Sequence, residues 1–383
     1  MGIVYPRVIS LCFAAALVAS VAVAQAPNIR VAGRVQAQYR MASGDSTAAF
    51  PGTGVNNGFE IRRLRIQADV RFGDYINLVI QPSFEMSALR MRDAFLRVGF
   101  GPRFGIAVGQ EKSPFQRYEL NSSNNLLSIE RGLRIIGLSG REALNDLLVN
   151  NGYASHDLGA FADYTAPRGS VKFGVSNGSR ESATDVNNAK SFFGRATYVA
   201  MVDKDGQAVL QIGGSFGARD RAVAPVGVAF LADSSLRTTA FGLDAEWGGF
   251  RPGLHVIADF ATGDNVPIAR RVNVGRNTGN VQNTADSNVV KFIGFHLVGA
   301  YRILTKGDDN RTVKFIEPAL RLDATDPNTN VDGDAGVLIT PVLNIYFGAT
   351  VIWRTALDWY RYRDAAGATH TAREFKISWQ ANF

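Results

Sequence analysis

Apolar and polar positions alternate along most of the chain, and the last ten residues, 374–383, show this pattern most clearly. Successive side chains of a strand point to opposite faces, so the alternation predicts a strand with one apolar and one polar face. Such a strand suits a transmembrane barrel, with its apolar face toward lipid and its polar face toward a water-filled lumen. A soluble sandwich could end in the same way. The apolar face carries the odd-numbered residues Phe375, Ile377, Trp379, Ala381 and Phe383. The polar face carries the even-numbered residues Glu374, Lys376, Ser378, Gln380 and Asn382.

Fifteen earlier stretches alternate in a similar way. Together with residues 370–383 they make about sixteen strands, and an even number is the rule in single-chain bacterial barrels. The fifteen stretches are 28–41, 60–72, 75–85, 89–100, 103–112, 156–165, 169–178, 190–203, 206–218, 236–249, 250–262, 288–305, 310–326, 334–348 and 349–363.

The connections between these stretches alternate in length. Short turns on one rim and long loops on the other are the outer-membrane pattern, and a soluble sandwich has no reason to keep it. We therefore predict one domain, a 16-stranded antiparallel transmembrane β-barrel, with both termini at the short-turn, periplasmic rim. The connection near 86–88 is short where a long one is expected. Tight turns are expected near 73–74, 101–102, 166–168, 204–205, 249–250, 306–309 and 348–349, and long loops near 42–57, 113–155, 179–189, 219–235, 263–287 and 327–333.

The longest irregular stretch, residues 113–155, does not alternate. Irregular segments of this size are uncommon unless they are functional. Within it, residues 141–150 could form a short helix.

The amino-terminal segment has the features of a secretory signal. Arg7 precedes an apolar run over 8–23, and Ala22-Val23-Ala24 forms a small-x-small cleavage site. We expect a signal peptide over 1–24 and a mature barrel over 25–383. A retained anchor is the alternative, but the run is shorter than the ~20 apolar residues of a spanning helix.

The positive charge of the chain comes mostly from arginine. The formal net charge is +7, and charge facing lipid costs about 2–4 kcal/mol at the midplane, so strand arginines belong in the lumen. There they attract anions. Alternatively they pair with luminal acids, and we expect half or more to do so. Parity places in the lumen Arg34, Arg40, Arg63, Arg65, Arg71, Arg97, Arg195, Arg321 and Arg354, together with Asp69, Glu85, Asp93, Asp244, Asp259, Glu317 and Asp358, whereas Arg62 has the other parity and is expected at the mouth of its strand.

Several motifs between residues 61 and 133 bring a family resemblance. They are IRRLRI at 61–66, MRDAFL at 91–96, VGQEKSPF at 108–115, NSSN at 121–124 and IER at 129–131. In these the chain resembles the phosphate-selective porin O and P family. Later segments that also fit are 174–178, 300–304 and 343–347.

This resemblance implies a trimer of sixteen-stranded barrels, a third long loop that folds inward to narrow the pore, and basic side chains along an anion path. Residues 113–155 are the third connection on the long-loop rim, after 42–57 and the short one near 86–88, and match that constriction loop. Arg62 and Arg63 match the family's paired arginines, and Lys112 matches the lysine that enters the loop.

The predicted loop carries charges of both signs, which favours a transverse field. Its basic residues are Arg117, Arg131, Arg134 and Arg141, and the acids near them are Glu111, Glu119 and Glu130. We expect Lys112, Arg63 and Arg65 nearest the narrowest point. The residues predicted to line the anion path are Arg34, Arg62, Arg63, Arg65, Arg97, Lys112, Arg131, Arg195 and Arg354.

These features predict an outer-membrane channel for passive diffusion of small anions, with phosphate or polyphosphate as candidate solutes. A general or weakly selective porin for other small hydrophilic solutes is the alternative within this class. An outer-membrane enzyme and a plugged structural barrel are alternatives from other classes. Among partners we expect small anions, outer-membrane lipid and two further copies of the chain, and we expect no nucleic acid.

No chemical motif favours catalysis, a cofactor or a metal. Gly-x-Ser-x-Gly sequences occur at 174–178 and 213–217, but both lie within predicted strands and not at the strand-to-helix turn that carries this motif in many serine hydrolases. Its four histidines have no metal-ligand spacing, and we expect His255 and His296 to be wall residues. The loop at 328–333 begins like a calcium loop but has Ile339 where the bidentate glutamate would stand. The histidines are His156, His255, His296 and His370.

Overall fold

A computed structural model gives the architecture of most of the chain. The expected signal peptide, residues 1–24, lies outside the described part. The structure describes residues 26–44, 57–85, 88–135, 142–181, 185, 188–224, 235–266, 271–273, 280–283, 289–305, 312–363 and 368–383.

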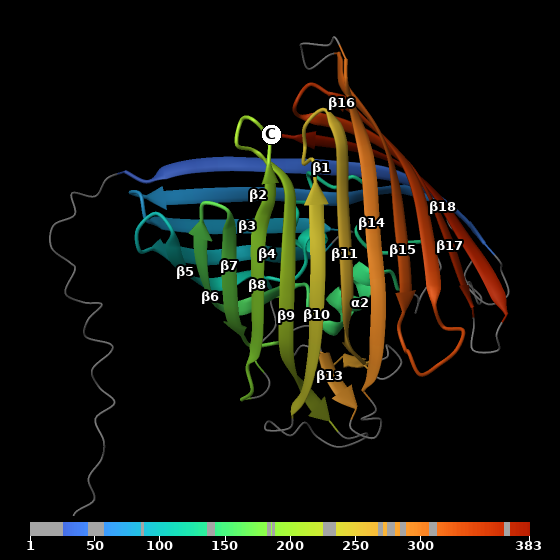
Figure 1. The fold of residues 1–383 in the computed structure, drawn as a ribbon, viewed down its shortest axis with the longest axis horizontal. Helices are drawn as coiled ribbons and strands as arrows, with labels where there is room; N and C mark the ends of the chain where they lie inside the picture. Colours follow the sequence, from blue (N-terminus) through green and yellow to red (C-terminus); the bar gives the residue numbers. More distant parts are fainter. Residues whose placement is uncertain are drawn as a thin grey trace, which may run out of the picture.

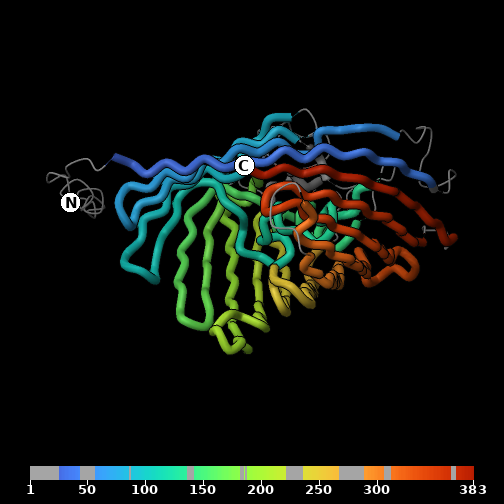
Figure 2. Tube along the Cα trace, turned by 90° about the horizontal axis from the view of Figure 1, so that it is seen from above, coloured from blue at the N-terminus to red at the C-terminus, as the bar shows by residue number. Residues whose placement is uncertain are grey.

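Sixteen antiparallel strands form one sheet that closes on itself (Figures 1 and 2), which confirms the predicted barrel. Consecutive strands pair, β11 pairs with β14, and β18 pairs with β1. The barrel strands are β1 (Asn28–Gly44), β2 (Gly58–Phe72), β3 (Ile76–Glu85), β4 (Ala88–Gly99), β5 (Phe104–Lys112), β6 (His156–Ala166), β7 (Gly169–Ser176), β8 (Ser191–Val202), β9 (Ala208–Ala224), β10 (Ser235–Trp247), β11 (Gly253–Asn265), β14 (Val290–Leu304), β15 (Val313–Asp326), β16 (Gly336–Phe347), β17 (Val351–Arg363) and β18 (Thr369–Asn382).

Two short strands lie beyond the wall, in the connection between β11 and β14. They are β12 (Arg271–Asn273) and β13 (Asn280–Asn283), which pair with each other. β13 also pairs in parallel with the end of β9. They extend the sheet without adding a strand to the ring.

The parity rule holds around the wall. Val35 and Trp379 are 38% and 46% exposed, whereas their neighbours Gln36 and Ser378 are 1% and 0% exposed. Apolar side chains therefore cover the outside and polar ones face the interior. In the described residues, no helix is long and apolar enough to cross a membrane.

The parity rule breaks at a bulge in β2. Gln36 of β1 stands opposite Arg63, and Ala37 stands opposite Ile61, so Arg62 is an extra residue. An extra residue in one strand re-aims its side chain. Arg62 therefore faces inward beside Arg63, and the expectation that it sits at the mouth of the strand is wrong.

A second irregularity lies between β3 and β4. Ile80 stands opposite Ala94 and Pro82 opposite Met91, which leaves two residues of β4 against one of β3. Simple alternation would place Arg92 with Ala94 on the lipid face. The irregularity instead lets Arg92 reach Glu85 inside the barrel.

The long connection between β5 and β6 contains α1 (Arg117–Leu120) and α2 (Leu144–Asn151). The second helix matches the short helix expected near 141–150. An apolar cluster joins this segment to inward side chains of β10, β11 and β14; its buried members are Phe115, Leu144, Leu147, Leu148, Tyr153, Ala154, Ala240, Ala261 and Phe292. Apolar residues on the polar face of the wall thus hold the loop.

Candidate functional site

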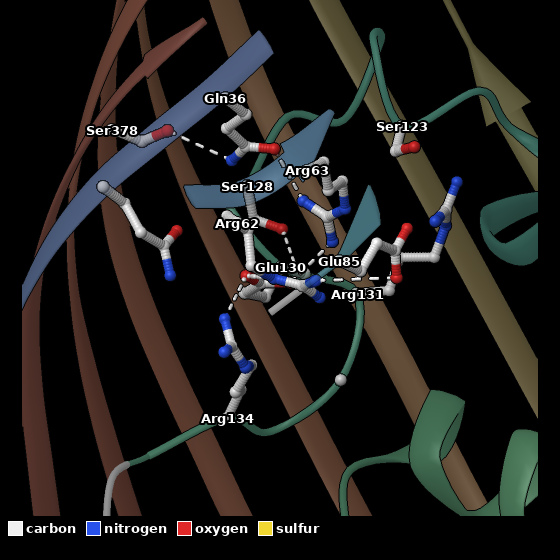
Figure 3. A network of polar contacts seen from close by, with 12 residues as sticks. Gln36, Arg62, Arg63, Glu85, Ser123, Ser128, Glu130, Arg131, Arg134 and Ser378 are labelled. Atoms are coloured by element: carbon white, nitrogen blue, oxygen red, sulfur yellow. Dashed lines mark hydrogen bonds and ion pairs between the residues drawn. The ribbon is translucent and has the colours of Figure 1, made fainter. Parts of the chain in front are cut away.

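Glu130, in the long loop, is the centre of a polar network on the β2 wall (Figure 3). Its carboxylate accepts from Arg62 Nε at 2.5 Å and from Arg63 Nη2 at 2.7 Å. Arg134, four residues further along the loop, donates to the same carboxylate at 3.3 Å. Burial alone would raise the pKa of Glu130, but the Arg62 and Arg63 guanidiniums hold it well below its usual range.

The main chain of Glu130 is held from another part of the ring. Arg321 of β15 donates from Nη1 to the Glu130 carbonyl at 2.8 Å, and its Nε binds Asp323 at 2.6 Å. One loop residue therefore ties β2 to β15.

The loop tip, Ser123 and Asn124, rests on three arginines. Arg34 of β1 donates to the Ser123 hydroxyl and to the Asn124 side-chain oxygen. Arg65 reaches the same hydroxyl at 3.1 Å, and Arg354 of β17 reaches the Asn124 carbonyl at 3.2 Å. Three guanidiniums from β1, β2 and β17 thus converge on two neutral residues.

Two of these arginines form no ion pair with any acid that the structure describes. Arg34 is 4% exposed and Arg354 is 1% exposed. Within the described residues, no carboxylate lies at ion-pair distance from either, and Arg354 instead donates to Gln380 at 2.8 Å. The third, Arg65, ion-pairs with Glu85, which also binds Arg92.

Lys112, at the start of the loop, faces an acid that two cations share. Its Nζ lies 3.2 Å from Glu119 Oε1, and Arg131 Nε lies 3.5 Å from Glu119 Oε2. Burial would raise the pKa of Glu119, but the two cations outweigh it and lower the pKa to about 2. The side chains of Lys112 and Arg131 are 20% and 11% exposed, so both are partly accessible.

Acidic side chains gather on the other side of the ring. Asp259 of β11 accepts from the backbone N–H groups of Arg117 and Tyr118 at 3.1 and 3.3 Å. Across the pair β10–β11, Asp259 stands opposite Asp244, which binds Arg195 at 2.7 Å. In a ring of sixteen strands, β10 lies about half a turn from β1 and β2, so the loop lies between a basic and an acidic wall.

His255 and His296 are side chains of the wall, and each is paired with an acid. His255 lies 2.9 Å from Glu246, and His296 lies 3.2 Å from Asp323. In the part of the chain that the structure describes, no group of histidines, cysteines and acids is placed to hold a metal ion.

The structure brings most of the predicted path residues together around the loop. Two lie elsewhere: Arg97 binds Asp163 at 2.6 Å close to the short turn after β4, and Arg195 is on the acidic wall. Arg141 lies outside the described residues. Those gathered at the loop are Arg34, Arg62, Arg63, Arg65, Lys112, Arg131 and Arg354.

Pairing of the luminal arginines is extensive. Six of the nine placed inside by parity form ion pairs, which confirms the expectation of half or more; they are Arg40, Arg63, Arg65, Arg97, Arg195 and Arg321. Simple alternation missed Arg92, which binds Glu85 and Glu181. Its one signal in the sequence was its place in the motif at 91–96.

Comparison with known proteins identifies the family. The family model described as phosphate-selective porin O and P matches residues 29–242. No curated protein matches the sequence.

Solved porins share the fold. An anion-selective porin from Comamonas acidovorans has a TM-score of 0.59 at 11% identity, covering 93% of this chain and all of that one. The trimer form of OmpT from Vibrio cholerae has a TM-score of 0.57 at 12% identity, covering 94% of this chain and all of that one. The channel DcaP of Acinetobacter baumannii has a TM-score of 0.56 at 11% identity, covering 94% of this chain and 98% of that one.

The family model matches more than half of the chain, so the chain belongs to the phosphate-selective porin O and P family.

Proposed function

We propose that this outer-membrane porin lets small anions diffuse passively through a lumen narrowed by residues 113–155. Membership of a porin family and the closed barrel support a channel for small solutes and no catalysis. The preference for anions, with phosphate or polyphosphate as candidates, is the finer part of the proposal.

The observation that carries this preference is an excess of positive charge on one wall. Five arginines of β1, β2 and β17 face the loop, and the carboxylates that ion-pair with them are Glu85 and Glu130. The five guanidiniums and these two carboxylates together carry a net charge of +3. Charges of one sign in a narrow lumen raise the local concentration of counter-ions and their entry rate. The five are Arg34, Arg62, Arg63, Arg65 and Arg354.

We assign different roles to this basic wall and to the two cations near it, Lys112 of β5 and Arg131 of the loop. Arg34, Arg63 and Arg354 are at most 4% exposed and act on a passing anion through their field. Lys112 and Arg131 are more open to water and would contact the solute. Contact must remain weak, because tight binding would stop conduction.

The opposing acids support the alternative, a general or weakly selective porin. Asp244 and Asp259 lie on β10 and β11, about half a turn around the ring from the basic wall, and Arg195 pairs with Asp244. A transverse field of this kind orients polar solutes without excluding cations. The sign of the ion preference separates the two functions.

The test is the reversal potential in planar bilayers under a potassium chloride gradient. We expect a potential of anion sign, and a potential of cation sign would end the proposed preference. Lys112→Glu should lower chloride permeation relative to potassium. Lys204→Glu, on an exposed turn, is the matched control and should change little.

Block by added phosphate would identify phosphate as a bound solute. Single-channel chloride current should fall as phosphate is raised at constant ionic strength. An unchanged current would leave a channel for other small anions.

We further propose cleavage after Ala24 and assembly as a homotrimer. The residues before the cleavage site have the signal-peptide features given above, and the similar OmpT structure is a trimer form. Mass spectrometry of the outer-membrane protein and its size in mild detergent test these two points.

A further inference from the structure

The outer surface of β17 and β18 (red in Figure 2) carries three exposed arginines near one rim of the barrel. From Leu357 to Arg363, the odd-numbered residues of β17 are exposed, and the even-numbered ones are buried and face the lumen. Arg361 and Arg363 are therefore on the outer face. Arg373 of β18 stands opposite Trp359 of β17 and is exposed on the same face. We call these three arginines the outer basic cluster.

The three side chains are close enough to contact one molecule. Arg361 and Arg363 are two residues apart on one strand, which separates their Cα atoms by about 7 Å. Arg361 stands opposite Thr371, so Arg373 is its diagonal neighbour across the strand pair, at about 7–8 Å. Long side chains reach across such diagonal pairs, so the guanidiniums can converge on one head group.

The outer basic cluster has no acidic partner, unlike other exposed basic residues at the same rim. Three of those, also at the long-loop ends of their strands, form ion pairs: Arg90 with Glu181, Arg237 with Asp220 and Lys291 with Asp264. No carboxylate that the structure describes lies at ion-pair distance from Arg361, Arg363 or Arg373. Three positive charges therefore stand on the outer face without a counter-charge from the described part of the chain.

The cluster lies where a membrane changes from head groups to hydrocarbon. Consecutive barrel strands are antiparallel, so β17 and β18 are joined at the same rim as β5 and β6, the long-loop rim that we expect to face the outside of the cell. Further from this rim the outer face becomes apolar, with Trp359 and Leu357 36% and 42% exposed and Phe375 half-buried. Tryptophan is enriched at membrane interfaces, and the cost of a charge that faces lipid is small there.

We propose that the outer basic cluster binds the phosphate groups of an outer-leaflet glycolipid, whose acyl chains lie against Trp359, Leu357 and Phe375. Arginine binds phosphate oxygens through paired hydrogen bonds and stays charged when partly desolvated. The apolar surface next to the cluster favours a lipid over a free phosphate ion, because an ion would gain nothing from it. The site is outside the barrel, so it does not depend on which solute crosses the lumen.

Binding can be measured on the folded porin in an uncharged detergent. Lipid A, a glycolipid with phosphate groups and several acyl chains, would be added in increasing amounts, and native mass spectrometry would count the molecules retained on each barrel. We expect saturable retention of lipid A and much weaker retention of its dephosphorylated form. Equal retention of the two forms would overturn the proposal.

Substitutions test the assignment to these residues. Arg361→Gln should raise the half-saturating lipid A concentration about fivefold, which is the contribution of one basic residue near an anionic lipid surface. Arg361→Gln combined with Arg373→Gln should raise it further, to about 25-fold. An unchanged value in the double variant would refute the site, and if that variant does not fold, Arg361→Gln alone decides.

Lys291→Gln is the matched control. It removes the same charge from the outer face at the same rim, but Lys291 is already paired with Asp264. We expect its half-saturating concentration to stay close to that of the unchanged protein. Equal weakening in Lys291→Gln and Arg361→Gln would show that binding follows overall charge, and would overturn the assignment to the cluster.

Two further measurements separate other occupants of the cluster. Complete displacement of lipid A by millimolar inorganic phosphate at constant ionic strength would show an ion site without a lipid. Loss of oligomers in the double variant with unchanged lipid retention would show a contact between copies of the chain. Either result would overturn the lipid site.

The reversal potential keeps this proposal apart from the proposed anion preference. It should be the same in the double variant and the unchanged protein, because the cluster lies outside the lumen. A shift toward cation sign in the double variant would place the cluster on the solute path and would overturn its assignment to lipid. Cation sign in the unchanged protein removes the anion preference alone.

Discussion

At the scale of single residues, Glu130 shows how one carboxylate can organise a loop. Its side chain joins β2 through Arg62 and Arg63, and its carbonyl joins β15 through Arg321. It is 5% exposed. Breaking a buried ion pair by removing one partner leaves an uncompensated buried charge.

Glu130→Gln should therefore destabilise the loop and the barrel. We expect a loss of about 3 kcal/mol or more in the free energy of unfolding, measured by urea titration in detergent, together with a noisier open-channel current. Glu60→Gln is the control, because Glu60 binds Arg134 but is more exposed and leaves the Arg62 and Arg63 pairs intact. Equal losses in the two variants would contradict the role of Glu130.

Asp146 of α2 links the two arms of the loop, and its protonation makes the stability of the folded protein depend on pH. Its carboxylate accepts from the backbone N–H groups of Leu133 and Ala143. Burial raises the pKa of Asp146 from 3.8 to about 7, against the opposing effect of these two bonds. The folded state thus binds this proton more tightly than the unfolded chain does. The contribution of the protonated carboxyl to the free energy of unfolding is therefore full below pH 3.8 and is lost as the pH rises through 7.

Asp146→Asn should remove this part of the pH dependence. The free energy of unfolding of the unchanged protein should fall more between pH 5 and pH 8 than that of the variant. Each pKa unit corresponds to about 1.4 kcal/mol, less where water reaches the partly exposed carboxyl. The comparison isolates Asp146 from the other acids and the histidines, which are the same in both proteins; parallel curves would show that its proton is not linked to folding.

At the scale of elements, irregular strand pairing directs charge into the lumen. The bulge at Arg62 and the extra residue near Arg92 turn side chains inward that strict alternation would turn toward lipid. Both lie within motifs that carried the family resemblance. The neighbouring strand β5 adapts through Gly109, which has φ of 135° and stands opposite Phe95.

Gly109→Ala should disturb the pairing of β4 and β5. An added Cβ would lie 2.3 Å from the carbonyl oxygen of Ala94, and the positive φ is strained for alanine. We expect a loss of about 1–3 kcal/mol in unfolding free energy. At Gly194, a Cβ would meet nothing nearer than 4.0 Å, so Gly194→Ala should change stability little. Similar losses at both glycines would refute this explanation.

At the scale of the whole molecule, the barrel depends on the meeting of its two ends. Gly33 N–H donates to the Phe383 carbonyl at 2.8 Å, and Phe383 N–H donates back at 3.0 Å. The Phe383 ring covers Gly33, where a Cβ would lie 2.4 Å from the ring and 2.7 Å from the Arg65 carbonyl oxygen. Closure leaves no free sheet edge in the membrane.

Gly33→Val should impair this closure. We expect less of the compact, heat-modifiable form in unheated gel electrophoresis after refolding, because the valine side chain would displace Phe383 and press on the β2 backbone. Gly58→Val is the control, since nothing lies within 4 Å of a Cβ there. A full yield of compact Gly33→Val would show that the last residue is dispensable for closure.

The number of strands, their order and the face of most residues can be predicted from the amino-acid pattern alone. Side chains of a strand alternate between its two faces, so a short segment such as 374–383 is enough to predict which face is buried. The same parity put Arg34, Arg63 and Arg354 inside. It also predicted the long loop and the short helix within it, since both are breaks in a local pattern.

Which charged side chains meet depends on the three-dimensional arrangement of the strands. The bulge that turns Arg62 inward depends on the register between β1 and β2, which cannot be predicted from the sequence of β2 alone. The partners of the loop are distant along the chain: Arg321 binds the Arg131 carbonyl and Arg354 binds that of Asn124, across 190 and 230 residues. Such contacts follow from closing the ring around the loop, because only closure brings β2, β15 and β17 to one interior.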